Sequence, residues 1–332
     1  MNSTASPTDR YLKVLEKHWG YTEFRGIQRD IIESIGAGRD TLGLMPTGGG
    51  KSITFQVPAM VLPGVCVVVT PLIALMKDQV AGLRKRHIRA AALHAGLGHE
   101  EILTILDNCV FGHYKFLYVS PERLSSEIFM AKFRHMEVSF VTIDEAHCIS
   151  QWGHDFRPAY LQIAELRKVK PDCPVLALTA TATPEVARDI QHVLRFRQEN
   201  VFRMSFYRPN LAYQVLWADF SLQSLRRVLE AENGSCIIYR RSRQQCEDLS
   251  KVLNQWGFTS TFFHAGLSHP EKDKRQTLWV QDKVRIMVAT SAFGMGIDKA
   301  DVRLVVHLDI PDSIEEYFQE PGEWVVRRNL RK

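Results

Sequence analysis

Short runs of apolar residues recur along the chain, each followed by a polar loop and a stretch of helical character. In the first half these runs are Val65–Val69, Phe116–Val119, Val138–Ile143 and Val175–Leu178. Nearly continuous valine, isoleucine and leucine is typical of strands buried on both faces of a parallel sheet. Their alternation with helices predicts βαβ units and an α/β fold. Ligands bind such sheets beyond the carboxyl ends of the strands, so the informative loops follow the apolar runs.

The alternation starts again after Tyr207–Asn210, a turn-like sequence. The apolar runs of the second half are Cys236–Tyr239, Arg285–Ala289 and Leu304–Leu308. The tetrapeptide His-Ala-Gly-Leu occurs at 94–97 and again at 264–267, each time after a short apolar run. This repeat predicts two related domains, which we place at residues 1–208 and 209–332.

Composition sets wide limits. A chain of 332 residues with 45% hydrophobic residues can bury two cores. No apolar run approaches the roughly 20 residues of a membrane helix, and the N-terminal sequence lacks the pattern of a signal peptide. We therefore expect a soluble, intracellular protein without a membrane partner. The net charge of +5 permits a polyanionic partner but does not demonstrate one.

The six cysteines include no Cys-x-x-Cys pair, and several lie in apolar runs. This pattern favours reduced, buried thiols, and we expect no zinc in this chain.

A glycine-rich loop follows the predicted strand Leu42–Met45. It reads Pro46, Thr47, Gly48, Gly49, Gly50, Lys51, Ser52, and a helix-like stretch comes next. Backbone N–H groups of such a loop cradle phosphate oxygens, and the helix N-terminus adds positive potential. Lys51 would reach the β- and γ-phosphates of ATP, and Ser52 would hold Mg²⁺. The strict pattern has glycine where Met45 stands, so a glycine-rich turn with an incidental lysine remains the alternative.

An acidic pair follows the predicted strand Val138–Ile143. Asp144 would bind Mg²⁺, and Glu145 would take the proton from an attacking water. The alternative is an acidic helix cap.

These segments resemble motifs of superfamily-two helicases, as does Ala177–Thr183, which reads Ala-Leu-Thr-Ala-Thr-Ala-Thr. Three more segments resemble the RecQ branch, namely Gly20–Gln28, the aromatic-rich Ile149–Pro158 and Ala292–Asp298. The resemblance covers residues 11–320. It implies two tandem RecA-like lobes, each a mostly parallel sheet flanked by helices, the first a DEAH-type ATP-binding lobe and the second a C-terminal helicase lobe.

The resemblance also assigns the nucleotide site. Tyr21 would stack on adenine, Gln28 would pair with its edge, and Arg25 would support the pocket. Asp298 in the second lobe would accept from the ribose hydroxyl. His147 joins Lys51, Asp144 and Glu145 as a catalytic residue. For Tyr21 and Phe24, ordinary packing against a helix remains the alternative.

DNA binding and its coupling to ATP are assigned to the loop after residue 147. Exposed aromatic side chains beside a cation suit stacking on unpaired bases. A buried aromatic cluster is the alternative. The resemblance adds two threonines that relay between the ATP and DNA sites. The residues concerned are Trp152, His154, Phe156, Arg157, Thr179 and Thr181.

The match to the family breaks after Gly322. The family has arginines where this chain has Glu323 and Val326, and its zinc-binding and winged-helix region would lie beyond Lys332. An arginine finger is typically worth about 10³–10⁵ in rate, so we expect impaired hydrolysis.

The favoured interpretation is an ATP-dependent 3′–5′ DNA helicase that acts on single-stranded and forked duplex DNA in repair and recombination. We expect a monomer in the bacterial cytoplasm at the nucleoid, or in the nucleus if the source is eukaryotic. The alternative is an ATP- and DNA-binding remnant with little turnover. An RNA helicase stays open, because backbone contacts do not distinguish the two polymers reliably. An unrelated P-loop ATPase or nucleotide kinase would not explain the second lobe.

Overall fold

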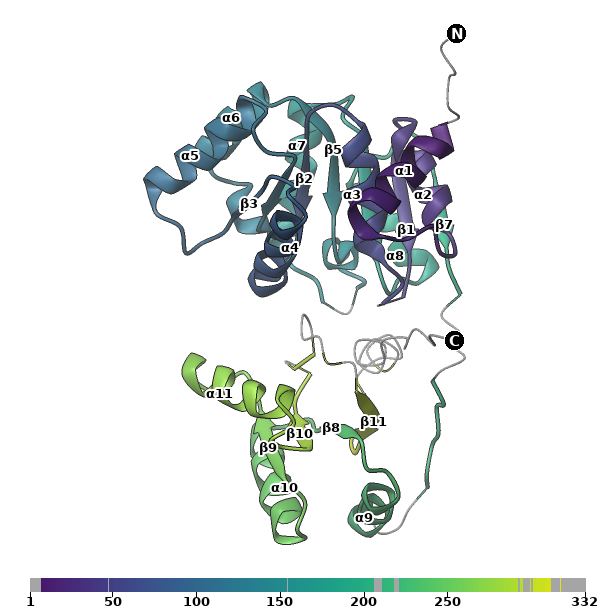
Figure 1. Cartoon of the computed structure of the whole chain (residues 1–332), viewed down its shortest axis with the longest axis vertical. Coiled ribbons are helices and arrows are strands. Elements are labelled where there is room, and N and C mark those ends of the chain that lie inside the picture. Colours follow the sequence, from purple (N-terminus) through teal and green to yellow (C-terminus); the bar gives the residue numbers. More distant parts are fainter. Residues whose placement is uncertain are drawn as a thin grey trace. The chain divides into compact units, whose positions relative to one another are not determined.

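The chain folds into two compact units, Met1–Phe206 and Tyr207–Lys332 (Figure 1). A computed structural model describes residues 7–46, 48–153, 155–205, 211–217, 221–291, 293, 294, 299, 301–311 and 317. Each unit is described by itself.

The first unit is built on a seven-stranded sheet in the order β3-β4-β2-β5-β6-β1-β7. All of its strand pairs are parallel, as the continuous apolar runs predict. The strands are β1 (Thr41–Leu44), β2 (Val65–Val69), β3 (Ala90–Leu93), β4 (Phe116–Val119), β5 (Val138–Ile143), β6 (Val175–Thr179) and β7 (Val201–Arg203).

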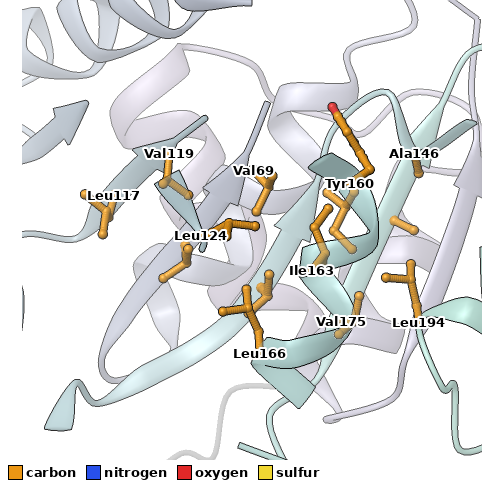
Figure 2. Packing of buried hydrophobic residues seen from close by; sticks show 14 of the residues in the cluster. Val69, Leu117, Val119, Leu124, Ala146, Tyr160, Ile163, Leu166, Val175 and Leu194 are labelled. Carbon is orange, nitrogen blue, oxygen red and sulfur yellow. The ribbon is translucent and has the colours of Figure 1, made fainter. Parts of the chain in front are cut away.

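Helices cover both faces of this sheet, because alternate strand residues point to opposite sides. Val67 and Val69 pack with Phe129 of one helix group, whereas Val68 packs with Phe55 of the other. Figure 2 shows part of the first of these two cores. The helices are α1 (Pro7–Trp19), α2 (Gln28–Gly36), α3 (Lys51–Val61), α4 (Ile73–Lys85), α5 (His99–Val110), α6 (Glu127–His135), α7 (Ile163–Val169) and α8 (Pro184–Val193).

A buried ionic network connects Asp40, just before β1, with residues 167–197 near the end of the unit's sequence. The Asp40 carboxylate accepts hydrogen bonds from the Arg167 guanidinium at 3.0 and 2.9 Å, and from Nε of Arg197 at 3.2 Å. Backbone N–H groups of Val175 and Arg197 also donate to it, each at 3.0 Å. Asp40 and Arg167 are both buried, so this carboxylate has its charge balanced inside the protein.

The second unit contains a parallel sheet in the order β11-β8-β10-β9. Two apolar clusters lie on its two faces. At the start of α10, Ser242 and Gln245 form a capping box, which satisfies two backbone N–H groups. The elements are α9 (Ser221–Ala231), β8 (Ser235–Tyr239), α10 (Arg243–Gln255), β9 (Ser260–Phe263), α11 (His269–Val280), β10 (Ile286–Ala289) and β11 (Val302–His307).

The repeated tetrapeptide occupies equivalent places in the two sheets. His94 follows β3 and His264 follows β9, and each of these strands is an edge strand. The order β3-β4-β2-β5 corresponds strand for strand to β9-β10-β8-β11. The expectation of an α/β fold with two related parallel-sheet lobes is therefore confirmed.

Two expectations from composition concern the membrane and the thiols. Within the described residues, no helix has the length and apolar character needed to cross a bilayer. All six cysteines are free thiols; five are buried and Cys173 is partly buried.

Candidate ATP-binding and coupling site

The glycine-rich loop joins β1 to α3, at the carboxyl end of a strand that lies between β6 and β7. Gly48 and Gly50 have φ of 74° and 80°, in the left-handed region that glycine adopts without strain. A Cβ on Gly50 would lie 2.3 Å from Nε2 of Gln28, so a side chain here would displace the end of Gln28 from its contact with the loop. Thr47 lies outside the described residues. The loop geometry is compatible with the predicted phosphate cradle, which stays a prediction.

Lys51 and Ser52 occupy the first turn of α3, which has no side-chain cap at Gly50. The first N–H groups of an uncapped helix are available to an anion. Nζ of Lys51 lies 3.1 Å from Oε1 of Glu145, and both side chains are largely buried. The structure thus brings the predicted phosphate-binding cation against the predicted general base, although 94 positions separate them in the chain.

Asp144 and Glu145 form the turn at the carboxyl end of β5. The backbone N–H of Asp144 donates to Val69 O on neighbouring β2 at 2.9 Å, which continues the sheet pairing into the site. Glu145 has φ 48° and ψ 48°, a left-handed conformation that is unfavourable for a residue with a side chain. Such strain persists where surrounding structure enforces it, and it is concentrated at functional sites.

Burial raises the pKa of Asp144 to about 6, and the neighbouring charge of Glu145 contributes, while Lys51 acts in the opposite direction. Two adjacent carboxylates and one ammonium leave excess negative charge in a buried place, which fits a divalent cation. Mg²⁺ would be held by Asp144 and Ser52, and when bound it would stabilise charge developing on the phosphate oxygens.

His147 links this turn to β6. Its Nδ1 lies 2.8 Å from Oγ1 of Thr179 and 3.5 Å from Oε2 of Glu145. Oγ1 of Thr179 in turn donates to the backbone carbonyl of Thr181 at 3.0 Å. The predicted catalytic histidine therefore contacts Thr179, which in turn contacts Thr181, and all three residues are buried.

The aromatic-rich loop leaves directly from this cluster. The N–H of Arg157 donates to the carbonyl of Cys148 at 2.9 Å, which closes the loop on itself. A Cβ on Gly153 would lie 2.6 Å from the carbonyl oxygen of His147, so the loop crosses close to that turn. Trp152 is 81% exposed, whereas Phe156 is only partly exposed. A wholly buried aromatic cluster is thus wrong for Trp152. His154 lies outside the described residues.

Two loop contacts were missed by sequence reasoning. The carboxylate of Asp155 pairs with Arg157, with Oδ2 at 2.7 Å from Nη2 and 3.0 Å from Nε. The hydroxyl of Tyr160 donates to the backbone carbonyl of Asp144 at 3.0 Å. Figure 2 shows the Tyr160 ring extending beyond the aliphatic side chains, with its hydroxyl at the far end. A tyrosine 16 positions from the acidic turn gives no signal in the sequence.

The predicted adenine residues lie at the entrance to α2. Tyr21 is 46% exposed, and the Arg25 guanidinium lies 5.4 Å from its ring centre. Nε2 of Gln28 donates to the carbonyls of Gly49 and Gly50 at 3.2 and 3.1 Å, and its Oε1 accepts from the N–H of Arg25 at 2.8 Å. Gln28 therefore contacts the phosphate loop itself.

Phe24, unlike Tyr21, packs against the apolar cluster of α1 to α3, so the packing alternative holds for Phe24. The roles in adenine recognition remain predictions. In the second unit, Asp298, Glu323 and Val326 lie outside the described residues.

A glycine-rich loop and an acidic turn at strand ends of a doubly wound parallel lobe define the nucleotide-binding lobe of a P-loop ATPase. Residues 25–190 match the DEAD/DEAH box helicase family, and residues 221–322 match the helicase conserved C-terminal domain.

Two similar curated proteins are named ATP-dependent DNA helicase RecQ. The protein of Pasteurella multocida is 42% identical over 312 residues, covering 94% of this chain and 49% of that protein. The protein of Bacillus subtilis is 40% identical over 316 residues, covering 94% of this chain and 54% of that protein. The chain belongs to the DEAD/DEAH box helicase family and, within it, to the RecQ family. It spans about half the length of these relatives.

Solved structures with similar folds include Mycobacterium smegmatis helicase Lhr bound to single-stranded DNA and AMP-PNP. Its TM-score is 0.69 at 20% identity, over 97% of this chain and 46% of that one. Saccharomyces cerevisiae Dbp5 bound to RNA and ADP BeF3 gives 0.70 at 14% identity, over 97% and 84%. At these identities the similarity shows the fold alone.

Proposed function

We propose that this chain is the motor of a RecQ-type DNA helicase, which couples ATP hydrolysis to 3′–5′ movement along single-stranded DNA and to duplex separation. The observation that carries the proposal is a set of contacts that leads from Lys51 and Glu145 to the aromatic-rich loop. Glu145 contacts His147, and the carbonyl of the next residue, Cys148, accepts from the N–H of Arg157 in the loop that exposes Trp152. One end of this set has the residues for ATP chemistry, and the other has an exposed aromatic surface.

The chain's own residues divide the chemistry among them. Lys51 and the N–H groups of the loop would hold the phosphates, and Glu145 would orient a water and take its proton. His147, which contacts both Glu145 and Thr179, is placed to pass a change at the loop to the proton acceptor. DNA on Trp152 would thereby alter the position of Glu145.

Single-stranded and forked duplex DNA is the proposed substrate, in repair and recombination, with the chain acting as a monomer at a bacterial nucleoid or in a nucleus. DNA as the polymer is supported by the name of the relatives, ATP-dependent DNA helicase RecQ, which are 42% and 40% identical over 94% of this chain. Stacking on an exposed aromatic side chain does not select DNA over RNA, so competition between the two polymers has to decide this point.

We further propose that hydrolysis by this chain is slow. The family's two arginines are replaced by Glu323 and Val326, and the match to the C-terminal helicase domain ends at residue 322. Without that charge stabilisation, turnover falls far more than nucleotide affinity does. The alternative function, an ATP- and DNA-binding protein with little turnover, differs from the first in this rate alone.

The test is the ATPase rate with and without single-stranded DNA, measured beside nucleotide affinity. Lys51→Ala should weaken nucleotide binding at least about tenfold. Lys13→Ala, which removes an exposed lysine of α1 paired with Asp9, is the matched control. Unchanged affinity in Lys51→Ala would refute the phosphate site.

A separate variant tests the proposal that hydrolysis is slow because the arginine finger is replaced. Glu323→Arg with Val326→Arg, together with Trp324→Ala and Val325→Gly, should raise DNA-stimulated hydrolysis by orders of magnitude, since a finger contributes about 10³–10⁵. Rapid hydrolysis by the unchanged chain would contradict the proposed impairment.

A further inference from the structure

Three side chains with metal-binding atoms meet between the acidic turn and the aromatic-rich loop. Sγ of Cys148 lies 3.7 Å from Nε2 of His147 and 3.6 Å from Oδ2 of Asp155. All three atoms lie within 4.8 Å of one another. His147 and Cys148 are buried, whereas Asp155 is partly exposed, so the cluster has one side toward solvent. The expectation of no zinc was based on the lack of Cys-x-x-Cys pairs. That criterion does not detect a site in which cysteine, histidine and aspartate each supply one ligand.

The two distances from the Cys148 sulfur agree with tetrahedral coordination. With zinc–sulfur near ~2.3 Å and zinc–nitrogen near ~2.0 Å, two ligand atoms at a tetrahedral angle lie about 3.5 Å apart. The distances of 3.7 and 3.6 Å in the structure are close to that value before any rearrangement. One thiolate, one imidazole and one carboxylate form a donor set that zinc accepts, with water in the fourth position.

His147 is already oriented for this role. Its Nδ1 contacts Oγ1 of Thr179 at 2.8 Å, which leaves Nε2 directed toward Cys148. Metal-ligating histidines are commonly fixed in this way by a hydrogen bond at the other ring nitrogen. Thr179 is itself held by Thr181, so the imidazole would not have to turn to meet a metal.

We propose that His147, Cys148 and Asp155 form an inhibitory site for a thiophilic divalent metal such as Zn²⁺. Binding replaces the thiol proton of Cys148, which passes to solvent, with a metal–sulfur bond. The metal also competes with Arg157 for Oδ2 of Asp155, where Nη2 of Arg157 now lies at 2.7 Å. The S–H bond of Cys148 and the ion pair of Arg157 with Asp155 are thereby replaced by coordination of both residues to one metal ion.

The consequence is a loop fixed to the catalytic turn. His147 belongs to the turn after β5 and Asp155 to the aromatic-rich loop, so a shared metal would prevent one from moving against the other. Metal binding stands independently of the proposed function. The inhibition rests on that function, because it assumes that loop movement reports DNA to the ATP site.

Cobalt gives a direct test on the full chain after treatment with a chelator. Co²⁺ should produce a thiolate-to-cobalt charge-transfer band and intense tetrahedral visible bands, and Zn²⁺ should abolish both by displacement. Cys148→Ala should lose the charge-transfer band and weaken Co²⁺ binding at least about tenfold. Cys173→Ala, which removes the partly buried thiol elsewhere in the same lobe, should keep both. Absence of the band in the parent, or its persistence in Cys148→Ala, would overturn the inference.

A second readout does not depend on catalysis. Zn²⁺ should slow amide hydrogen exchange over residues 148–160 in the parent and in Cys173→Ala, but not in Cys148→Ala. In the arginine-restored variant, Zn²⁺ should also lower DNA-stimulated ATPase. If the arginine-restored variant shows the cobalt band but no DNA-stimulated ATPase, the result counts against the proposed function alone. DNA-stimulated ATPase without a cobalt band would count against the metal site alone.

Discussion

The hydroxyl of Tyr160 donates a hydrogen bond of 3.0 Å to the backbone carbonyl of Asp144. Burial raises the pKa of this phenol well above its usual value, so it remains a donor at any working pH. The contact joins the short helix Pro158–Gln162, which follows the aromatic-rich loop, to the residue that would bind Mg²⁺. It gives the loop region a second connection to the proposed ATP site, separate from the one through His147.

Tyr160→Phe should therefore reduce the stimulation of ATPase by DNA while leaving nucleotide affinity nearly unchanged. The stability loss should be modest, about 1 kcal/mol for one buried hydrogen bond. Tyr118→Phe is the matched control, since Tyr118 is a buried tyrosine of β4 whose hydroxyl accepts from Gln56. Equal loss of stimulation in both variants would show that Tyr160 has no special part in coupling.

Asp144 predicts an unusual pH dependence of stability. Its pKa is raised from 3.8 to about 6, mainly by burial, so folding favours its neutral form. The stabilising contribution is complete below the unfolded pKa and is lost as pH rises through about 6.

Asp144→Asn should accordingly stabilise the metal-free protein at pH 8 and have little effect at pH 4. Thermal unfolding of parent and variant across this range measures the difference, and saturating Mg²⁺–ATP should stabilise only the parent. A stability difference that does not change with pH would contradict the raised pKa.

Trp152→Ala should lower DNA-stimulated ATPase more than it lowers DNA affinity. Trp152 is 81% exposed and offers one stacking surface, worth about 1–3 kcal/mol per base. Backbone phosphate contacts made elsewhere would maintain binding, and log affinity should still fall linearly with log salt. Trp217→Ala removes an even more exposed tryptophan, at 97%, and should leave the stimulation intact. A loss of affinity without loss of stimulation in Trp152→Ala would exclude the coupling role.

The buried network of Asp40 should be a main determinant of stability in the first lobe. Burial opposes ionisation, but hydrogen bonds from Arg197 and the charge of Arg167 outweigh it and hold the pKa of Asp40 below 3.8. Its stabilising effect is present above that value and is lost as pH falls through the folded pKa. Asp40→Ala leaves Arg167 buried without its partner, which typically costs about 3–5 kcal/mol.

Chemical unfolding at neutral pH measures the effect, with Asp9→Ala as control. Asp9 pairs with Lys13 on the surface of α1, so its loss should cost under about 1 kcal/mol. Similar losses in the two variants would show that the buried network contributes no more than a surface pair.

Much of the fold was readable because its central strands are buried on both faces. Val65–Val69 and Phe116–Val119 have in the structure the bounds that their apolar runs predicted. The edge strand Ala90–Leu93 gave a weaker pattern, since three alanines do not distinguish strand from helix. The correspondence of this strand with β9 was indicated instead by the repeated tetrapeptide, which follows both strands. That both are edge strands is seen only in the order of strands in the two sheets.

The candidate site was readable where one short segment carries the chemistry, as in the glycine-rich loop. It was not readable where separate segments meet through backbone groups. Gln28 donates to carbonyls of Gly49 and Gly50, and any residue type offers a carbonyl. The Cys148–Asp155 contact likewise depends on how the loop closes, which Arg157 and the carbonyl of Cys148 determine.

The left-handed backbone of Glu145 has a consequence for how this protein can evolve. A residue with a side chain in that region costs of order 1–3 kcal/mol, which glycine or asparagine would largely recover. Selection for heat resistance alone would therefore favour replacement of the carboxylate that we propose takes the proton from the attacking water. In the proposed role of Glu145, this left-handed backbone lowers the stability of the fold in exchange for hydrolytic activity.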